Sequence, residues 1–307
     1  MSTHTPALRT LPYAVVDVFA EHALEGNALA ILTDATDLST DDMQRIARET
    51  NLSETTFILP RSPEIERERG VQVRIFTTEE EFPFAGHPTL GTASWLHANH
   101  PHLRGADTIT LDLKAGLIPV TFHSANSAKP GIFGTMRQND PVFGATHDPA
   151  AIAAALNLAP EDLDLSAPIQ TVSTGIPFCI VPLRSLAVAA RLQIPQHTAR
   201  AYLARSDAKF FFCITPAAPG SAADWHARMQ FYNGEDPATG SAAGCAIAWL
   251  VRHGLVPSEH PVVLEQGIEM LRPSRIHLQA SLIGDRVSDV FVGGRTIPVA
   301  SGHLFLP

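Results

Sequence analysis

The sequence predicts an α+β protein of two pseudo-symmetric domains, each a mainly antiparallel, barrel-like sheet wrapped around one buried central helix. Three observations support this prediction: a motif that occurs twice in the chain, short apolar strand segments separated by glycine and proline, and two helical stretches that carry no charge until their far ends. The length of 307 residues also suits two domains.

The repeated motif occurs at 85–93 and again at 234–242. Both segments contain Pro-x-x-Gly followed by Ser or Thr and then Ala, and both lead to a Trp-Leu pair. His87 and Asp236 are 236 − 87 = 149 residues apart, and an apolar segment at 26–32 recurs at 175–181 with the same offset. These matches in one order indicate an ancient duplication with a cleft between the halves. Two unrelated α+β domains are the alternative.

The predicted strands are short, apolar and rich in β-branched residues. The first half contains 14–19, 29–32, 56–59, 71–76, 109–113 and 119–123, and the second half contains 170–173, 178–182, 210–215, 227–231, 262–265, 275–280 and 287–292. Because the connections contain glycine and proline, antiparallel pairing is expected.

Helices are expected between these strands. Ser39 is an N-cap with Asp42 three residues later, and Asp148 with Pro149 begins a helix over 150–157. The stretches 89–97 and 239–252 are rich in alanine and glycine, so each is expected to be the buried helix of its half. Their free N–H groups and positive dipole ends would face the cleft, where they could hold a carboxylate or a developing enolate.

The predicted division of the chain places residues 1–125 in the N-terminal half, completed by the last strand at about 296–307. Residues 132–295 form the C-terminal half, and 126–131 are the expected linker because they include serine, proline and glycine. The active-site cleft would lie between the two halves.

The charge of the chain argues against several classes of partner. A formal net charge of −9 and a pI near 5.8 argue against a nucleic-acid surface and against binding to anionic membranes. The best apolar run, 242–251, is about half the length of a membrane span, and the N-terminus lacks the pattern of a secretory signal. Cys179, Cys213 and Cys245 are widely spaced, as is typical of reduced thiols. A cytoplasmic protein is therefore expected.

His87 and Asp236 stand at corresponding places in the two motifs, before the buried helices. A histidine and an aspartate there can donate and accept protons, although His-Pro and Asp-Pro are also ordinary turn dipeptides. Ser241 can donate its hydroxyl to a substrate or stabilise the first turn of its helix. On spacing alone, the catalytic and the capping interpretations both stay open.

Glu54 follows a predicted helix and precedes an apolar strand. A carboxylate that leans into the interior at this point would have a raised pKa, in the range useful for acid–base catalysis. The alternative, a solvated loop glutamate, is what the sequence alone favours.

No cofactor and no metal are predicted. The chain has no Gly-x-Gly-x-x-Gly after a strand, no Walker loop and no Gly-x-Ser-x-Gly elbow. Histidines cluster at 97–102, but this polar segment has no cysteine or carboxylate to complete a metal site.

The motifs resemble those of the PhzF-like family of phenazine-biosynthesis isomerases. The resemblance covers nearly the whole chain, and its most specific parts are Gly-His-Pro at 86–88 and Glu-Asp-Pro-x-Thr-Gly-Ser at 235–241. Ala28 and Leu271 depart from the proline and the glycine that are common in the family, which affects loop geometry and not the active centre. Further matching segments are 17–19, 26–27, 52–55, 82–91, 266–267, 272–274, 292–294 and 302–304.

Two buried helices behind glycine-rich turns also resemble the diaminopimelate epimerase fold. Racemases and epimerases of that superfamily use a cysteine at the start of each helix, and neither helix start of this chain has one. A racemase with two thiols is therefore disfavoured.

The resemblance to the PhzF-like family implies an isomerase that needs no cofactor, with a role for each candidate residue. Glu54 would remove a proton from a substrate carbon and help to return one elsewhere. His87, Asp236 and Ser241 would orient the substrate and assist proton movement.

The same resemblance implies a small carboxylate substrate, held by Gly86, Thr239 and Gly240. The best-known family reaction isomerises dihydro-3-hydroxyanthranilate, a cyclic amino acid, and members are commonly homodimers. Two alternatives remain: a racemase or epimerase that uses Glu54 and His87 instead of thiols, and a non-catalytic protein that binds a small ligand.

Overall fold

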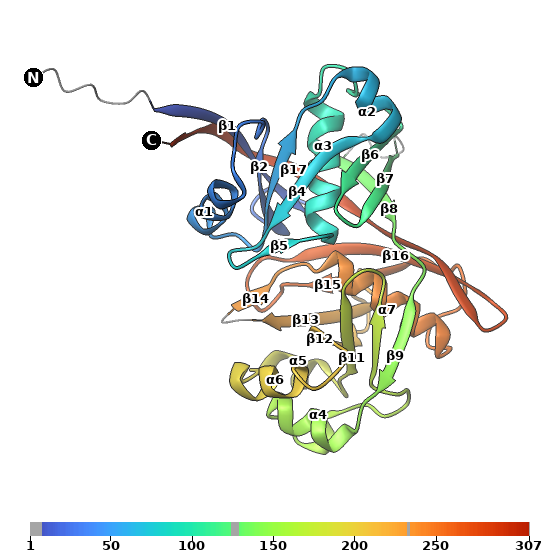
Figure 1. Ribbon diagram of the computed structural model, residues 1–307. Coiled ribbons are helices and arrows are strands. Elements are labelled where there is room, and N and C mark those ends of the chain that lie inside the picture. The colour runs from blue at the N-terminus through green and yellow to red at the C-terminus, as the bar shows by residue number, and fades with distance from the viewer. Residues whose placement is uncertain (1–7, 124–128, 232–233, 307) are drawn as a thin grey trace, which may run out of the picture.

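The computed structural model describes residues 8–123, 129–231 and 234–306. The strands of this part of the chain form one continuous sheet that curls into two lobes, one around helix α3 and one around helix α7 (Figure 1). The first half contains β1 (Arg9–Val18), β2 (Asn27–Leu32), α1 (Thr40–Thr50), β3 (Thr55–Leu59), α2 (Pro63–Arg69), β4 (Val71–Phe76), β5 (Glu81–Phe82), α3 (Gly86–Asn99), β6 (Thr108–Leu113), β7 (Gly116–Phe122) and β8 (Ile132–Arg137).

The second half has a similar but not identical order of strands and helices. Its elements are β9 (Val142–Thr146), α4 (Pro149–Leu156), the 3-10 turn η2 (Pro160–Asp162), β10 (Gln170–Ser173), β11 (Pro177–Pro182), α5 (Leu186–Arg191), α6 (Gln196–Leu203), β12 (Phe210–Pro216), β13 (Trp225–Phe231), β14 (Gly234–Asp236), α7 (Gly240–Arg252), β15 (Val262–Gln266), β16 (Ser274–Ile283) and β17 (Arg286–Leu306).

The first lobe is a closed barrel. Strands β1, β2, β3, β4, β6, β7, β8 and β17 each pair with the next, and β17 returns to β1. Helix α3 packs against β1, β2, β3, β6, β7, β8 and β17, so it lies inside the barrel, and ten of its fourteen residues are buried. A helix that is apolar on every side can be stable only in such a place.

The second lobe repeats the pairing of the first. The antiparallel pairs β10–β11, β12–β13, β15–β16 and β16–β17 correspond to β1–β2, β3–β4, β6–β7 and β7–β8 of the first lobe. The parallel pairs β11–β12 and β13–β15 correspond to β2–β3 and β4–β6. Helix α7, like α3, is buried against its strands. The predicted α+β fold of two barrel-like halves around buried helices is confirmed.

The structural offset between the halves differs from the one that the motif predicts. Strands β4 and β13 begin 225 − 71 = 154 residues apart, and helices α3 and α7 begin 240 − 86 = 154 residues apart. Gly86 therefore corresponds to Gly240, and His87 corresponds to Ser241. The expected correspondence of His87 with Asp236 is wrong, because the two Pro-x-x-Gly motifs stand on opposite sides of their helix starts.

Strand β17 belongs to both lobes. Its first part pairs with β16 and β8, and its last part, from Thr296 to Leu306, pairs antiparallel with β1. Strand β8, which follows the predicted linker, is hydrogen-bonded to β7 of the first lobe as well as to β17. The predicted boundary at 125, part of the linker (126–128) and residue 307 lie outside the described residues. The division at 125, 132 and 295 stays a prediction.

Several helix ends follow the sequence rules. The Ser39 side chain accepts a hydrogen bond from the Asp42 backbone N–H, and Asp148 does the same for Ala151, as their N-cap positions predict. Helix α3 begins at Gly86, three residues before the predicted start. Pro88 is compatible with this position because the first N–H groups of a helix have no intrahelical partner. The earlier start places His87 in the first helical turn.

Candidate active site

The starts of helices α3 and α7 touch each other. A Cβ on Gly86 would lie 2.6 Å from the backbone nitrogen of Ser241 and 2.8 Å from the Cα of Gly240. A Cβ on Gly240 would lie 2.9 Å from the ring of Phe19. Only glycine allows this approach, and it brings the free N–H groups of both helix starts to one place. Such a place is suited to binding an anion.

Asp236 ends strand β14, four residues before α7, and is 5% exposed. Its Oδ1 accepts hydrogen bonds from Asn27 Nδ2 at 2.7 Å and from Ser53 Oγ at 2.9 Å. Its Oδ2 accepts one from Thr239 Oγ1 at 2.6 Å. Because Asn27 and Ser53 belong to the first half of the chain, this carboxyl group joins the two halves.

Burial raises the pKa of Asp236 to about 6, although the three hydrogen bonds that it accepts act in the opposite direction. The neighbouring charge of Glu235 adds to the increase. A carboxyl group with a pKa near neutrality can change its protonation during a catalytic cycle.

Glu54 and His87 face each other, with Glu54 Oε2 3.5 Å from His87 Nδ1. Their side chains are 13% and 3% exposed. Glu54 comes from the loop between α1 and β3, and His87 from the first turn of α3. Burial, followed by the negative charge of Asp236, raises the pKa of Glu54 well above its ordinary value. Burial lowers the pKa of His87 to about 3, so its imidazole is neutral at physiological pH.

Asn27 also lies beside the His87 ring. Its amide nitrogen is 3.2 Å from His87 Nδ1. The two hydrogens of this amide are directed to Asp236 Oδ1 at 2.7 Å and to the Ala238 carbonyl oxygen at 2.9 Å. His87 Nε2 and Glu54 Oε2 are both buried without a hydrogen-bond partner among the described residues. Leaving such atoms unpaired is unfavourable, which is typical of groups that bind a ligand.

The structure thus brings His87 and Asp236 together through Asn27 and places Glu54 beside His87. Gly86, Gly240 and Ser241 lie at the helix starts beside them, and Ser241 is buried. The Thr239 hydroxyl donates to Asp236 and accepts from Gln266 Nε2 at 3.0 Å, so it is already used within the protein. The assignment of these residues as catalytic or substrate-binding stays a prediction.

Three residues of the site are absent from the predicted set: Asn27, Ser53 and Gln266. Gln266 donates to the Asp236 carbonyl at 2.7 Å and accepts from the Thr239 backbone N–H at 3.0 Å. All three stand in segments that carry the family resemblance, at 26–27, 52–55 and 266–267, so a signal for them was present in the sequence.

A pocket of about 430 Å³ adjoins the site. Ser53 and Glu235, the neighbours of Glu54 and Asp236, line it, and Thr77, Glu79 and Phe231 complete part of its wall. Its volume is that of a small-molecule pocket.

Other reactive groups lie elsewhere. The three cysteines are free and buried, and Cys245 lies inside α7 and not at its start. Among residues 8–123, 129–231 and 234–306, no group of three or more histidine, cysteine or acidic side chains could hold a metal ion. No helix in the same ranges is long and apolar enough to cross a membrane.

The chain matches the family described as "Phenazine biosynthesis-like protein" over residues 16–302. It is 35% identical over 297 residues to the trans-2,3-dihydro-3-hydroxyanthranilate isomerase of Pseudomonas aeruginosa, covering 96% of this chain and 99% of the relative. An uncharacterized isomerase of Mesorhizobium japonicum is 34% identical over 310 residues, covering 97% of this chain and all of the relative.

Solved structures agree with these relatives. A PhzF-family phenazine biosynthesis protein of Bacillus anthracis superposes with a TM-score of 0.83 at 25% identity, covering 96% of this chain and 99% of the other. A hydroxyproline epimerase of Agrobacterium vitis has a TM-score of 0.63 at 11% identity, covering 98% and 93%, and this likeness shows the fold alone. Since the family match and the relatives extend over nearly the whole chain, the protein belongs to the phenazine biosynthesis-like (PhzF) family and is an isomerase.

Proposed function

We propose that this isomerase moves a proton between two carbons of a small, cyclic or unsaturated, amino-acid-like carboxylate by general acid–base catalysis, with Glu54 as the proton carrier. One observation carries the proposal. Glu54 Oε2 and His87 Nε2 are buried and lack hydrogen-bond partners within the described part of the protein. A carboxyl group with a raised pKa and a neutral imidazole thus lie together beside the helix starts.

The protons can be followed through the proposed reaction. The Glu54 carboxylate takes a proton from a substrate C–H, and the electron pair left behind delocalises into the adjoining unsaturated system. The acidic proton of Glu54 exchanges with solvent, and the carboxyl group then delivers a proton to another carbon of that system. A raised pKa makes the carboxylate a stronger base and its acid form easier to reach near neutral pH.

Other groups of the site would stabilise the developing charge. His87 Nε2–H can donate to an oxygen of the substrate as negative charge appears on it. The backbone N–H groups at Gly86, Gly240 and Ser241 can hold the substrate carboxylate at the helix starts. Asp236, with its pKa of about 6, can accept a proton or orient an amino group. No step of this scheme needs a cofactor.

The substrate class is supported by the named relative. The Pseudomonas aeruginosa protein, 35% identical, is a trans-2,3-dihydro-3-hydroxyanthranilate isomerase. That molecule is a cyclic, unsaturated amino acid, so it has the acidic C–H, the conjugation and the carboxylate that the site could use.

We also propose a homodimer, as is common in the family, which light scattering of the purified protein tests directly.

The experiment is turnover of trans-2,3-dihydro-3-hydroxyanthranilate in D2O, followed by proton NMR, with enzyme that has been dialysed against a metal chelator. The proposal predicts a shifted double bond and solvent deuterium at the new C–H. Deuterium at an α-carbon with loss of optical rotation would instead identify a racemase or epimerase. Saturable binding of the molecule without deuterium incorporation would identify a binding protein.

A further inference from the structure

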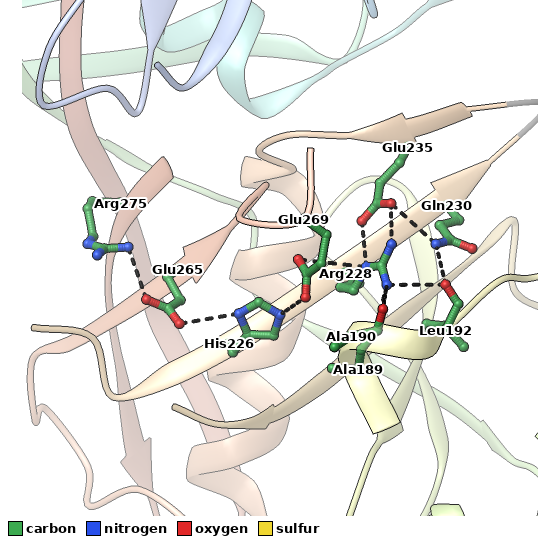
Figure 2. Close-up of polar contacts among 10 residues, drawn as sticks. All are labelled: Ala189, Ala190, Leu192, His226, Arg228, Gln230, Glu235, Glu265, Glu269 and Arg275. Carbon is green, nitrogen blue, oxygen red and sulfur yellow. Dashed lines mark hydrogen bonds and ion pairs between the residues drawn. The ribbon is translucent and has the colours of Figure 1, made fainter. Parts of the chain in front are cut away.

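Glu235, the residue before Asp236, is held by a buried arginine. Arg228 on β13 donates from Nε to Glu235 Oε1 at 2.7 Å and from a terminal nitrogen to Glu235 Oε2 at 2.5 Å (Figure 2). The side chains of this pair are 6% and 12% exposed. The remaining terminal nitrogen of Arg228 donates to the carbonyl oxygens of Ala189 at 2.6 Å and Leu192 at 3.1 Å. This guanidinium is fixed on all sides.

Further charged groups extend the contact away from the site (Figure 2). Glu269 Oε2 lies 3.8 Å from Arg228 Nε, and Glu269 Oε1 lies 3.0 Å from His226 Nε2. His226 Nδ1 lies 3.3 Å from Glu265, which pairs with Arg275 at 3.1 Å. These groups belong to β13, β15, β16 and the turn after β15, and the network connects the β13–β14 hairpin to the segment that carries Gln266.

The first half of the chain contains the same ion pair without an acid beside it. Arg74 on β4 donates to both oxygens of Glu81 on β5, at 2.8 and 2.9 Å. Arg74 and Arg228, and likewise Glu81 and Glu235, are 154 residues apart, the structural offset of the halves. The residue after Glu81 is Phe82, where the second half has Asp236. The duplication therefore supplies two equivalent ion pairs, Arg74–Glu81 and Arg228–Glu235. Of these two, the second adjoins the candidate site.

Two sets of groups surround the two neighbouring carboxylates. Arg228 and Gln230 on β13, and the more distant Glu269 on the turn, face Glu235. The set around Asp236 contains the polar groups of Asn27, Ser53 and Thr239 together with the nearby Glu54 and His87. Glu235 contributes to the raised pKa of Asp236, and Arg228 is the cation in direct contact with Glu235.

We propose that Arg228 is a positioning residue for Asp236. Its bidentate ion pair with Glu235 fixes the end of β14 and neutralises the Glu235 charge next to the catalytic carboxyl group of Asp236. This role rests on the proposed function of Asp236. Removal of the cation would leave Glu235 uncompensated in a buried place, and the ionised form of Asp236 would become less favourable.

The test is a titration of the Asp236 carboxyl carbon by 13C NMR, assigned with Asp236→Asn, combined with steady-state kinetics. We expect Arg228→Gln to raise the titration midpoint of Asp236 by about one pH unit. The double variant Arg228→Gln/Glu235→Gln removes both charges and should return the midpoint to that of the wild type. Arg228→Lys keeps the positive charge but cannot form the bidentate ion pair with Glu235. We therefore expect kcat to fall roughly tenfold while the titration midpoint of Asp236 stays that of the wild type.

Arg74→Gln is the matched control, because it removes the equivalent ion pair with Glu81, which is followed by Phe82. It should leave the Asp236 titration unchanged. An unchanged midpoint in Arg228→Gln, or an equal shift in Arg74→Gln, would overturn the proposal. If Arg228→Gln does not fold, the double variant decides the question. A raised Asp236 midpoint in the double variant would overturn the proposal, and a wild-type midpoint would support it. The titration needs no substrate, so failure of wild-type turnover would count against the proposed function alone.

Discussion

Oε2 of Glu54 lies 3.5 Å from Nδ1 of His87, yet the two groups are not an ordinary ion pair. Burial lowers the pKa of His87 to about 3 and raises that of Glu54, so both groups favour their neutral forms. The Asn27 amide nitrogen lies 3.2 Å from His87 Nδ1. The pair thus places a carboxyl group with a raised pKa next to a neutral imidazole, and both groups can take part in proton transfer at carbon.

Asn27→Leu tests the contacts that this amide makes with the second half of the chain. Leucine has a similar size but no donor, so Asp236 and the Ala238 carbonyl would each lose a hydrogen bond, and His87 Nδ1 would lose its polar neighbour. We expect kcat/KM to fall roughly 100-fold, as for the loss of one catalytic hydrogen-bond donor. Kinetics and 15N NMR of the His87 ring measure the two effects together. Asn99→Leu, at the exposed end of α3, is the control, and wild-type activity in Asn27→Leu would refute the role.

Activity should depend on the protonation of the Glu54–Asp236 pair. With a pKa of about 6 for Asp236, kcat/KM should be level above about pH 7 and fall tenfold per pH unit below pH 6. The apparent value belongs to the pair and not to one residue alone. A profile from pH 4.5 to 8.5 measures it, and a midpoint near pH 4, the ordinary aspartate value, would contradict the burial argument.

The raised pKa of Glu54 also has a consequence for stability. The folded protein holds the Glu54 proton more tightly than the unfolded chain, so this group lowers the free energy of unfolding as the pH rises through its folded pKa. Glu54→Gln removes that effect, and no hydrogen bond of Glu54 Oε2 is lost. We expect the variant to be more stable than the wild type at pH 8, by on the order of 1 kcal/mol, and equal to it near pH 4.

Urea unfolding at the two pH values measures the difference. Glu49→Gln, at an exposed position of helix α1 in the same lobe, is the control that changes the net charge equally. A Glu54→Gln protein that is less stable than the wild type at pH 8 would show that Glu54 stabilises the fold.

The contact between the two helix starts makes a separate prediction. Gly86→Ala would put a Cβ 2.6 Å from the Ser241 nitrogen, so the helix starts must move apart. A displacement of about 1 Å at a catalytic site can reduce the rate roughly 100-fold. The Cβ of Gly91→Ala in the same helix would meet side chains, those of Leu29 and Val18 at 2.7 Å and that of Val16 at 3.4 Å. This variant should lose stability but keep the activity of the folded enzyme. Equal activity per folded molecule in the two variants would contradict this reading.

Much of the fold could be predicted from local signals. Alternating apolar segments give most strands, and two charge-free stretches give the buried helices α3 and α7. Strands β5, β8, β9 and β14 and helices α2, α5 and α6 lie outside the predicted elements, because each has at most eight residues and gives only a weak periodic signal. The length of β17 depends on pairing with strands from both lobes, which no local pattern of its 21 residues contains.

The site could be predicted only in part, for a related reason. Glu54, His87 and Asp236 are reactive residues in specific motifs, so the sequence indicates them individually. Their geometry depends on contacts across great separations, such as the 209 residues between Asn27 and Asp236. The motif offset of 149 residues also differs from the structural offset of 154. The Pro-x-x-Gly pattern lies within α3 in the first half and ends at the first residue of α7 in the second.

The most direct test of Glu54 as the proton carrier compares the wild type with Glu54→Gln on trans-2,3-dihydro-3-hydroxyanthranilate in D2O by NMR. Glutamine is nearly isosteric but cannot take up and return a proton. The account predicts product and carbon-bound deuterium with the wild type and neither with the variant, while substrate still binds to both. Equal deuterium incorporation by the two proteins would show that another group carries the proton.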